Sequence, residues 1–191
     1  LCLPLFELFK KFLLSGTFPK LWKISYIVPI FKSGESNKIG NFRGVCNQSS
    51  IPKLFDAIFT SQLQWISYSI IPDRQHGFIK NRSTLSDVLE YQSFLNQAFS
   101  NRSQIDSVYT DFAKAFYRVN NRVLIRKLSK LGFQDLTVQW LLLSFLSERV
   151  QIVRIGNYIS TPFEVSSGIP QGTQYEPILF LLFINDFVCY M

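Results

Sequence analysis

The strongest candidate for chemistry in this sequence is an aspartate that follows a short apolar run. Residues 105–112 favour extended structure and predict a β-strand, with Asp111 near its end. Mg²⁺ prefers oxygen ligands, and phosphoryl-transfer sites often hold it with one or two carboxylates and the substrate phosphates. Asp111 therefore suggests a metal-dependent reaction on phosphates, although an isolated aspartate is more often a loop or helix-capping residue.

A second candidate is the loop predicted at residues 166–173, which contains Gly168, Pro170 and Gly172. Glycine and proline shape tight loops in which the backbone can approach a ligand closely. Gln171 could present its amide to the edge of a base or a sugar. The alternative is a plain connector between a hairpin and a buried helix.

The sequence gives little support for a zinc site or for the active site of a hydrolase. The three cysteines are far apart, and with a single histidine, His76, they give no zinc site of familiar spacing. His76 has no serine or cysteine partner at a recognisable spacing, and no GxSxG motif is present. We therefore reject a hydrolase and expect His76 to be a structural or surface residue.

Composition indicates a folded, basic protein. Hydrophobic residues make up 47% of the 191 residues, charged residues make up 17%, and the net charge is +7. A basic surplus favours an anionic partner, most commonly nucleic acid, although an ordinary basic protein would look the same. We find no signal peptide and no apolar run long enough to span a membrane.

Periodicity and capping signals predict a mixed α+β fold. Gly156-Asn157 is a hairpin turn dipeptide between two of the predicted strands. Helices are predicted at residues 3–14, from Ser49 or Ser50 to about 66, 84–99, 120–131, 135–146 and 177–187. Strands are predicted at residues 23–30, 105–112, 150–155 and 158–165, and loops at 32–43, 72–83 and 166–173.

Four segments, taken together and in order, resemble the reverse transcriptases of non-LTR (LINE-type, jockey-like) retrotransposons. They are WKISYIVPIFKSG with NFR (22–34, 41–43), QHGFIKNRST (75–84), VYTDFAKAFYRV (108–119), and SGIPQGTQYEPILFLLF with INDF (167–187). Group II intron maturases and telomerase-like proteins share the fold, but the DF-KAF and IND strings fit the LINE-type branch better.

The resemblance implies a right-hand polymerase fold, with a fingers-like region at about 1–104 and a palm-like region at about 105–191. It implies RNA-templated DNA synthesis, with an RNA template, a DNA primer and deoxynucleoside triphosphates as partners. Such enzymes act in the cytoplasm, the nucleus or both.

The resemblance also assigns roles to single residues. Asp111 matches the first carboxylate of a two-metal Mg²⁺ site, and the backbone carbonyl of Phe112 would share that ion. Phe116 matches the aromatic residue that crowds the 2′ side of the sugar and so selects deoxynucleotides.

Four further residues are expected to bind the nucleotide. Gln171 and Gly172 match the loop that packs near the incoming nucleotide and the template. Lys32 and Arg43 match residues of the fingers that contact the triphosphate. Positive groups at that place would offset the charge on the transferring phosphoryl group.

The sequence departs from the family pattern at several positions. Tyr117 replaces a second aspartate, Gly44 replaces a proline, and Tyr175-Glu176 replaces Leu-Gly. The F/Y-A-D-D box that carries the second acidic pair is also absent, so we expect an incomplete metal site and no activity from this chain alone. Asp186 occupies a position where the family also has aspartate, and we expect it to be structural.

Two alternatives therefore stay open beside the polymerase. One is a remnant of a decayed element that binds nucleic acid without catalysis. The other is a chain that does not fold stably.

Overall fold

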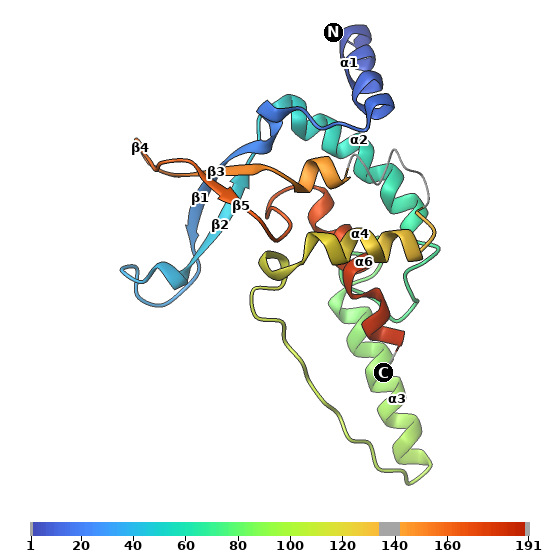
Figure 1. The fold of residues 1–191 in the computed structure, drawn as a ribbon. Coiled ribbons are helices and arrows are strands. Elements are labelled where there is room, and N and C mark those ends of the chain that lie inside the picture. The colour runs from blue at the N-terminus through green and yellow to red at the C-terminus, as the bar shows by residue number, and fades with distance from the viewer. Residues whose placement is uncertain (1, 134–141, 190–191) are drawn as a thin grey trace.

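The computed structural model describes residues 2–133 and 142–189, and it has the α+β composition predicted from the sequence (Figure 1). Its helices are α1 (Cys2–Ser15), α2 (Ser50–Ser67), α3 (Thr84–Ser100), α4 (Asn121–Lys130) and α6 (Tyr175–Cys189), with short 3-10 turns η1 (Lys20–Lys23), η2 (Ile39–Asn41) and η3 (Ala115–Arg118). Its strands are β1 (Ile24–Phe31), β2 (Phe42–Asn47), β3 (Arg149–Ile155), β4 (Tyr158–Ile159) and β5 (Phe163–Val165). Of the helix predicted at 135–146, residues 142–146 are helical and 134–141 lie outside the described residues.

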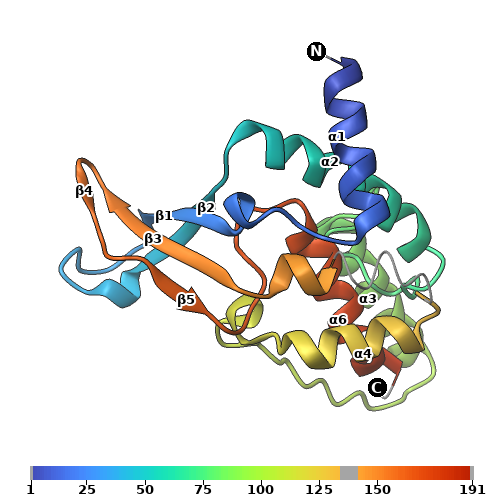
Figure 2. The same ribbon diagram turned by 45° about the horizontal axis from the view of Figure 1, so that its top comes forward.

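The strands form one mixed sheet at one end of the molecule, while the helices gather at the other (Figure 2). β1 pairs antiparallel with β2 and parallel with β3, and β3 continues the sheet through β4 and β5. The loop predicted at 32–43 ends at Asn41, and β2 was missed because FRGVCN lacks a clear alternation of polar and apolar residues. The strand predicted at 158–165 is interrupted at residues 160–162, which include Pro162.

Aromatic side chains from α1, η1 and α2 build one part of the core. Phe55 is 2% exposed, and its ring lies 5.2 Å from that of Phe9 and 5.7 Å from that of Trp22. Phe18 joins this cluster to the helical segment 142–146 through an edge contact with Phe145 at 5.1 Å. Edge contacts of this kind add specific geometry to the burial of large apolar surfaces.

α6 forms the centre of the other part of the core. It is apolar nearly all round, and Leu179 and Leu182 are fully buried, as the sequence predicts for a buried helix. α2 and α4 both pack against it. At its exposed end Asp186 forms an ion pair with Lys127 of α4 at 2.5 Å, a contact that joins the two helices and supports the structural role predicted for it. The Lys127 hydrogen bond also lowers the pKa of Asp186.

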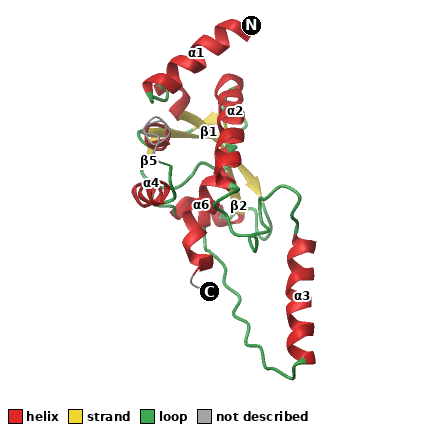
Figure 3. Ribbon diagram, turned by 90° about the vertical axis from the view of Figure 1, so that its right-hand side faces the viewer, coloured by secondary structure: helices red, strands yellow, loops and turns green. Residues whose placement is uncertain are grey.

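α3 differs from the other helices because none of its residues is buried. It projects from the body in two views, and a long extended segment returns from its far end to η3 (Figures 1 and 3). The apolar residues that predicted an amphipathic helix, such as Leu85 and Phe99, are 66% exposed each. The helix is therefore confirmed, but packing within the described residues does not cover it.

The predicted division at residue 104 falls within this exposed excursion. β1 from the first region nevertheless pairs with β3 from the second, so the two regions share one sheet and one core. The division into fingers and palm stays a prediction. None of the described helices combines the length and the apolar character needed to cross a membrane.

A polar cluster is buried where α2, β3 and α6 meet. Asp56 is fully buried, and Arg149 and Tyr175 are 2% and 1% exposed. The charge of Arg149 and the polar groups of Tyr175 and Gln48 act on the Asp56 carboxylate, but neither of its oxygens has a well-aligned hydrogen-bond partner. Burial consequently raises the pKa of Asp56 from 3.8 to about 6.

This raised pKa makes the contribution of Asp56 to stability depend on pH. Between the unfolded and folded pKa values the folded chain binds the proton more tightly, so the free energy of unfolding should rise as the pH falls from 7 to 4.5. A shift of this size corresponds to about 2 to 3 kcal/mol. We expect urea unfolding to show this gain for the unmodified chain relative to Asp56→Asn, with exposed Asp106→Asn as the control. Identical pH profiles for the chain and its Asp56→Asn variant would contradict the prediction.

Candidate nucleotide site

The loop at residues 166–173 joins three separate parts of the chain through its backbone. The amides of Gly168 and Ile169 donate to the carbonyl oxygens of Val119 and Phe116, each at 2.9 Å. On the other side of the loop, the Cys46 amide of β2 donates to the Gln171 carbonyl oxygen at 2.7 Å. The loop is therefore more than a connector, because it fixes η3 relative to β2.

Two glycines make this close approach possible. Gly168 has φ +85°, and a Cβ at this position would lie 2.8 Å from the Tyr117 carbonyl oxygen. Gly172 has φ +97°, and a Cβ there would lie 2.8 Å from the Cys46 carbonyl oxygen. Both positions combine a conformation that L-residues rarely adopt with backbone contact that leaves no room for a side chain.

Tyr117 holds the Gln171 side chain in place. Its hydroxyl lies 2.9 Å from Gln171 Oε1 and 3.0 Å from the Gly44 carbonyl oxygen, and it can donate its single proton to either. Burial, with a smaller contribution from the charge of Glu176, raises the pKa of Tyr117, so the hydroxyl stays protonated and remains a donor at neutral pH. A proton donated to Oε1 leaves the Gln171 Nε2 group as the donor toward a ligand.

Glu176 closes the same loop from the first turn of α6. Its Oε2 accepts a hydrogen bond from the Gly172 amide at 2.7 Å. Burial raises the pKa of Glu176, while this hydrogen bond and the charge of Arg43 partly oppose the rise. Arg43 also acts on Tyr117 through its charge, so Arg43, Tyr117 and Glu176 lie in one neighbourhood.

Phe116 and Lys32 stand at the borders of this neighbourhood. Phe116 is half-buried, with its ring 4.8 Å from that of Phe180 and 6.3 Å from that of Phe78. Lys32 is exposed, and its amide donates to the Asn41 carbonyl oxygen where β1 ends. Since Ile30 is paired with Arg43, the alternation of side chains places Lys32 on the same face of the hairpin as Arg43.

The strand predicted at 105–112 is wrong. These residues belong to no strand, and residues 104–112 make no backbone hydrogen bond to another described segment. A strand requires a neighbour for its N–H and C=O groups, and the described part of the chain supplies none here. Asp111 is consequently exposed instead of being held at the end of a strand.

Phe112 nevertheless keeps Asp111 near the rest of the predicted site. Its ring lies 6.3 Å from Phe180, the same ring that contacts Phe116, and 5.8 Å from Phe187. The structure therefore brings together the loop, η3 and the β1–β2 hairpin, and it attaches the Asp111 segment to their edge through aromatic contacts.

The described residues do not form a magnesium site by themselves. Among them, no group of three or more His, Cys, Asp or Glu side chains is placed to hold a metal ion. Asp111 would bring one carboxylate and Phe112 one carbonyl oxygen, which is fewer oxygens than a hard cation requires. The predicted metal ligands therefore need further ligands from elsewhere.

Three of the residues that depart from the family pattern, Gly44, Tyr117 and Glu176, are linked directly or through the 166–173 loop. Tyr117 reaches the carbonyl of Gly44, where an added Cβ would lie 2.9 Å from a methyl group of Ile27. Glu176 binds the loop that Tyr117 also contacts, and Tyr175 is buried against Asp56. Sequence reasoning treated these positions as separate defects and missed the bridging role of Tyr117. The hydrogen bond of Glu176 could have been predicted, because Glu176 follows Gly172 by four residues at the start of a helix, within reach of the Gly172 amide.

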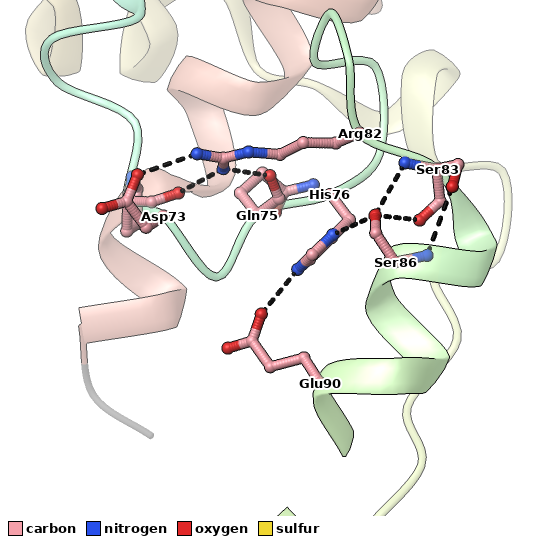
Figure 4. Close-up of polar contacts among 8 residues, drawn as sticks. Asp73, Gln75, His76, Arg82, Ser83, Ser86 and Glu90 are labelled. Atoms are coloured by element: carbon pink, nitrogen blue, oxygen red, sulfur yellow. Dashed lines mark hydrogen bonds and ion pairs between the residues drawn. The ribbon is translucent and has the colours of Figure 1, made fainter. Parts of the chain in front are cut away.

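The histidine of the QHGF element also gains partners that its spacing did not reveal (Figure 4). His76 Nδ1 lies 2.8 Å from Ser86 Oγ, and its Nε2 lies 2.9 Å from Glu90 Oε2. The Ser86 hydroxyl, however, accepts from the Ser83 amide as part of the capping box of α3. His76 is therefore structural, as predicted, and it anchors the projecting α3.

Arg82 closes the loop that precedes α3. Its guanidinium donates to the Gln75 and Pro72 carbonyl oxygens at 2.7 and 3.2 Å and pairs with Asp73 at 2.8 Å (Figure 4). The QHGFIKNRST element thus serves to shape the base of α3.

A glycine substitution in the 166–173 loop should be costly because of contact as well as conformation. We expect Gly168→Ala to lower the free energy of unfolding by at least about 2 kcal/mol, since strain and overpacking add. The control is Gly132→Ala, whose φ of +94° is similar but whose Cβ would meet nothing within 4 Å. This variant should lose only about 1 kcal/mol. Equal losses in urea unfolding would show that the backbone contact contributes nothing.

The sequence of the chain is similar to those of known proteins. Residues 30–190 match the reverse transcriptase (RNA-dependent DNA polymerase) family. The chain is 33% identical over 175 residues to a probable RNA-directed DNA polymerase from transposon BS of Drosophila melanogaster, covering 90% of the chain and 19% of the relative. It is 28% identical to the RNA-directed DNA polymerase from mobile element jockey of the same species, again covering 90% and 19%.

A more distant relative is a polyprotein of a retrotransposable element. The chain is 25% identical to the retrovirus-related Pol polyprotein from type-1 retrotransposable element R2 of Popillia japonica, covering 93% of the chain and 25% of the relative. The resemblance to non-LTR retrotransposon enzymes is thus confirmed, and the chain spans about a fifth of the length of the first two relatives. The chain belongs to the reverse transcriptase family.

Proposed function

We propose that this chain forms the nucleotide- and template-contacting part of an enzyme that copies RNA into DNA. The observation that carries the proposal is that the loop with Gln171 and Gly172 is hydrogen-bonded both to Phe116 and to β2, the strand that also carries Arg43. The resemblance to the family implies nucleotide contacts at these same positions, which supports the proposal. Its partners would be an RNA template, a DNA primer and deoxynucleoside triphosphates, in the cytoplasm or the nucleus.

Each residue has a physical role in this proposal. Lys32 and Arg43, on one face of the hairpin, would offset the negative charge of the triphosphate. Phe116, supported by Phe180, would present a rigid ring to the sugar. Gln171, held through Oε1 by Tyr117, would direct its amide N–H groups toward the nucleotide or the template.

Asp111 is proposed to supply one carboxylate to a Mg²⁺ site, with the Phe112 carbonyl as a second ligand. Magnesium would neutralise charge on the phosphates. The described residues do not complete such a site, so we assign no reaction step to this chain through the metal and expect no synthesis from the 191 residues alone.

A second candidate function is nucleic-acid binding without synthesis. The net charge of +7 favours it, and it requires no metal. Binding of RNA by a longer protein that also fails to extend a primer would support this alternative.

The test of the polymerase is primer extension on an RNA template with Mg²⁺ and deoxynucleotides. It compares the 191-residue chain with a protein lengthened by the reading frame that follows. We expect only the longer protein to make DNA, and Asp111→Asn to slow it at least about a hundredfold, because a metal-binding carboxylate is worth several kcal/mol.

The matched control is Asp106→Asn, which removes another exposed carboxylate from the same segment. This variant should keep its rate. Synthesis by the longer Asp111→Asn protein at the unmodified rate would refute the role of Asp111, and synthesis by the 191-residue chain would refute the expectation that it is inactive.

Phe116 provides a separate test of sugar selection. In the longer protein we expect Phe116→Ala to raise incorporation of ribonucleotides relative to deoxynucleotides by about tenfold or more, because removing a ring opens space worth 1 to 3 kcal/mol of discrimination. The control is Phe78→Ala, which removes a neighbouring ring that is 59% exposed. An unchanged ratio would assign Phe116 to the core alone.

A further inference from the structure

The charge surplus of the chain is concentrated in one short segment. Residues 112–134 contain six Lys and Arg residues and no Asp or Glu. The other residues then carry 14 basic and 13 acidic side chains, a surplus of only one out of the total of +7. Five of the six cations recur at every fourth position, namely Lys114, Arg118, Arg122, Arg126 and Lys130.

On α4 this spacing produces an exposed basic stripe, defined here as Arg122, Arg126 and Lys130. All three are exposed, whereas Leu124 and Leu128 on the opposite side of the helix are fully buried. α4 follows η3 and runs across the front of α6, against which it packs (Figure 1). The stripe spans about 12 Å at 1.5 Å per residue.

The charges of the stripe are not neutralised by the described residues. None of the three side chains lies within ion-pair distance of an acidic oxygen there. Lys127, which lies outside the stripe, is by contrast paired with Asp186. Glu148 borders the same surface depression as Arg122, but its ion pair is with Lys23 at 3.8 Å.

This arrangement disfavours the helix locally. Like charges four residues apart repel each other, and Arg122 places a cation at the positive N-terminal end of the helix dipole. An ordinary solvated helix face has no need of such a one-signed row, because interspersed acids would relieve the repulsion. A row of cations one residue wide matches the backbone of a single nucleic-acid strand, in which negative charges follow one another closely.

We propose that the basic stripe of α4 binds the phosphate backbone of single-stranded RNA. This surface lies outside the candidate nucleotide site and adds an anchoring place for the RNA that the family copies. Its contacts are to phosphates alone, so binding is independent of base sequence and strongly dependent on salt.

The experiment measures binding of the 191-residue chain to a fluorescent oligo(U) RNA over a range of salt concentrations, without Mg²⁺ or nucleotides. The test variant is Arg122→Gln/Arg126→Gln/Lys130→Gln. The matched control is Lys11→Gln/Lys53→Gln/Lys80→Gln, which removes three exposed cations elsewhere and the same net charge.

We expect the stripe variant to bind at least about tenfold more weakly at 0.1 M salt, and its log K against log[salt] slope to fall by about 2. The control variant should stay within about twofold of the unmodified chain. Arg122→Lys/Arg126→Lys keeps the charge and should retain binding. Circular dichroism checks folding, and if the triple variant does not fold, Arg126→Gln against Lys53→Gln gives the same comparison.

Equal losses in the stripe and control variants, or no loss in the stripe variant, would overturn the proposal. Tighter binding of duplex DNA or of polyglutamate than of oligo(U) would also overturn it, because the partner would then be of another kind. Since the assay needs neither metal nor nucleotide, failure of the proposed synthesis leaves this result unaffected, and the reverse holds as well.

Discussion

The close backbone approach of the 166–173 loop to η3 and β2 is the contact on which the candidate site depends. Hydrogen bonds from Gly168 and Ile169 hold η3, and the bond from Cys46 to Gln171 holds β2. With side chains absent at Gly168 and Gly172, three chain segments meet through their main chains, so their relative positions are set by covalent geometry and a few hydrogen bonds. The side chains of Tyr117 and Glu176 add hydrogen bonds to Gln171 and to the Gly172 amide of the same loop.

A second constraint is the need of every extended segment for a hydrogen-bonding neighbour. β1 finds β2 and β3 and becomes the centre of the sheet, whereas residues 105–112, with a comparable preference for extended structure, find no partner among the described residues. The aromatic contacts of Phe112 hold that segment against α6 without fixing its backbone. Whether each segment becomes a strand therefore depends on the segments beside it and not on its own residues.

This dependence on neighbours explains which parts of the structure could be predicted from the sequence. Signals that act within a few residues were reliable, so the Asn120 cap and the Gly132 end of α4 were confirmed, as was the apolar α6. Long-range pairing could not be inferred, so β2 was missed and the strand at 105–112 was wrong. The resemblance implied nucleotide contacts at Lys32, Arg43, Phe116, Gln171 and Gly172, and the structure brings together the segments that carry them. The hydrogen bonds of Tyr117 span 54 and 73 positions in the chain, a separation that no local pattern encodes.

The attachment of α3 has a mechanical consequence. A rod of 17 residues is about 25 Å long, so turning it by about 10° at its base displaces its far end by about 4 Å. The base of α3 is held by a few polar contacts of His76 and Arg82 that lie outside the packed core. A change in the angle of α3 would therefore leave the core unchanged. The segment that carries Asp111 starts at the far, C-terminal end of α3. The angle of α3, which the contacts of His76 help to set, therefore fixes where this segment begins, while the ring contacts of Phe112 hold its other end, beside Asp111, against α6.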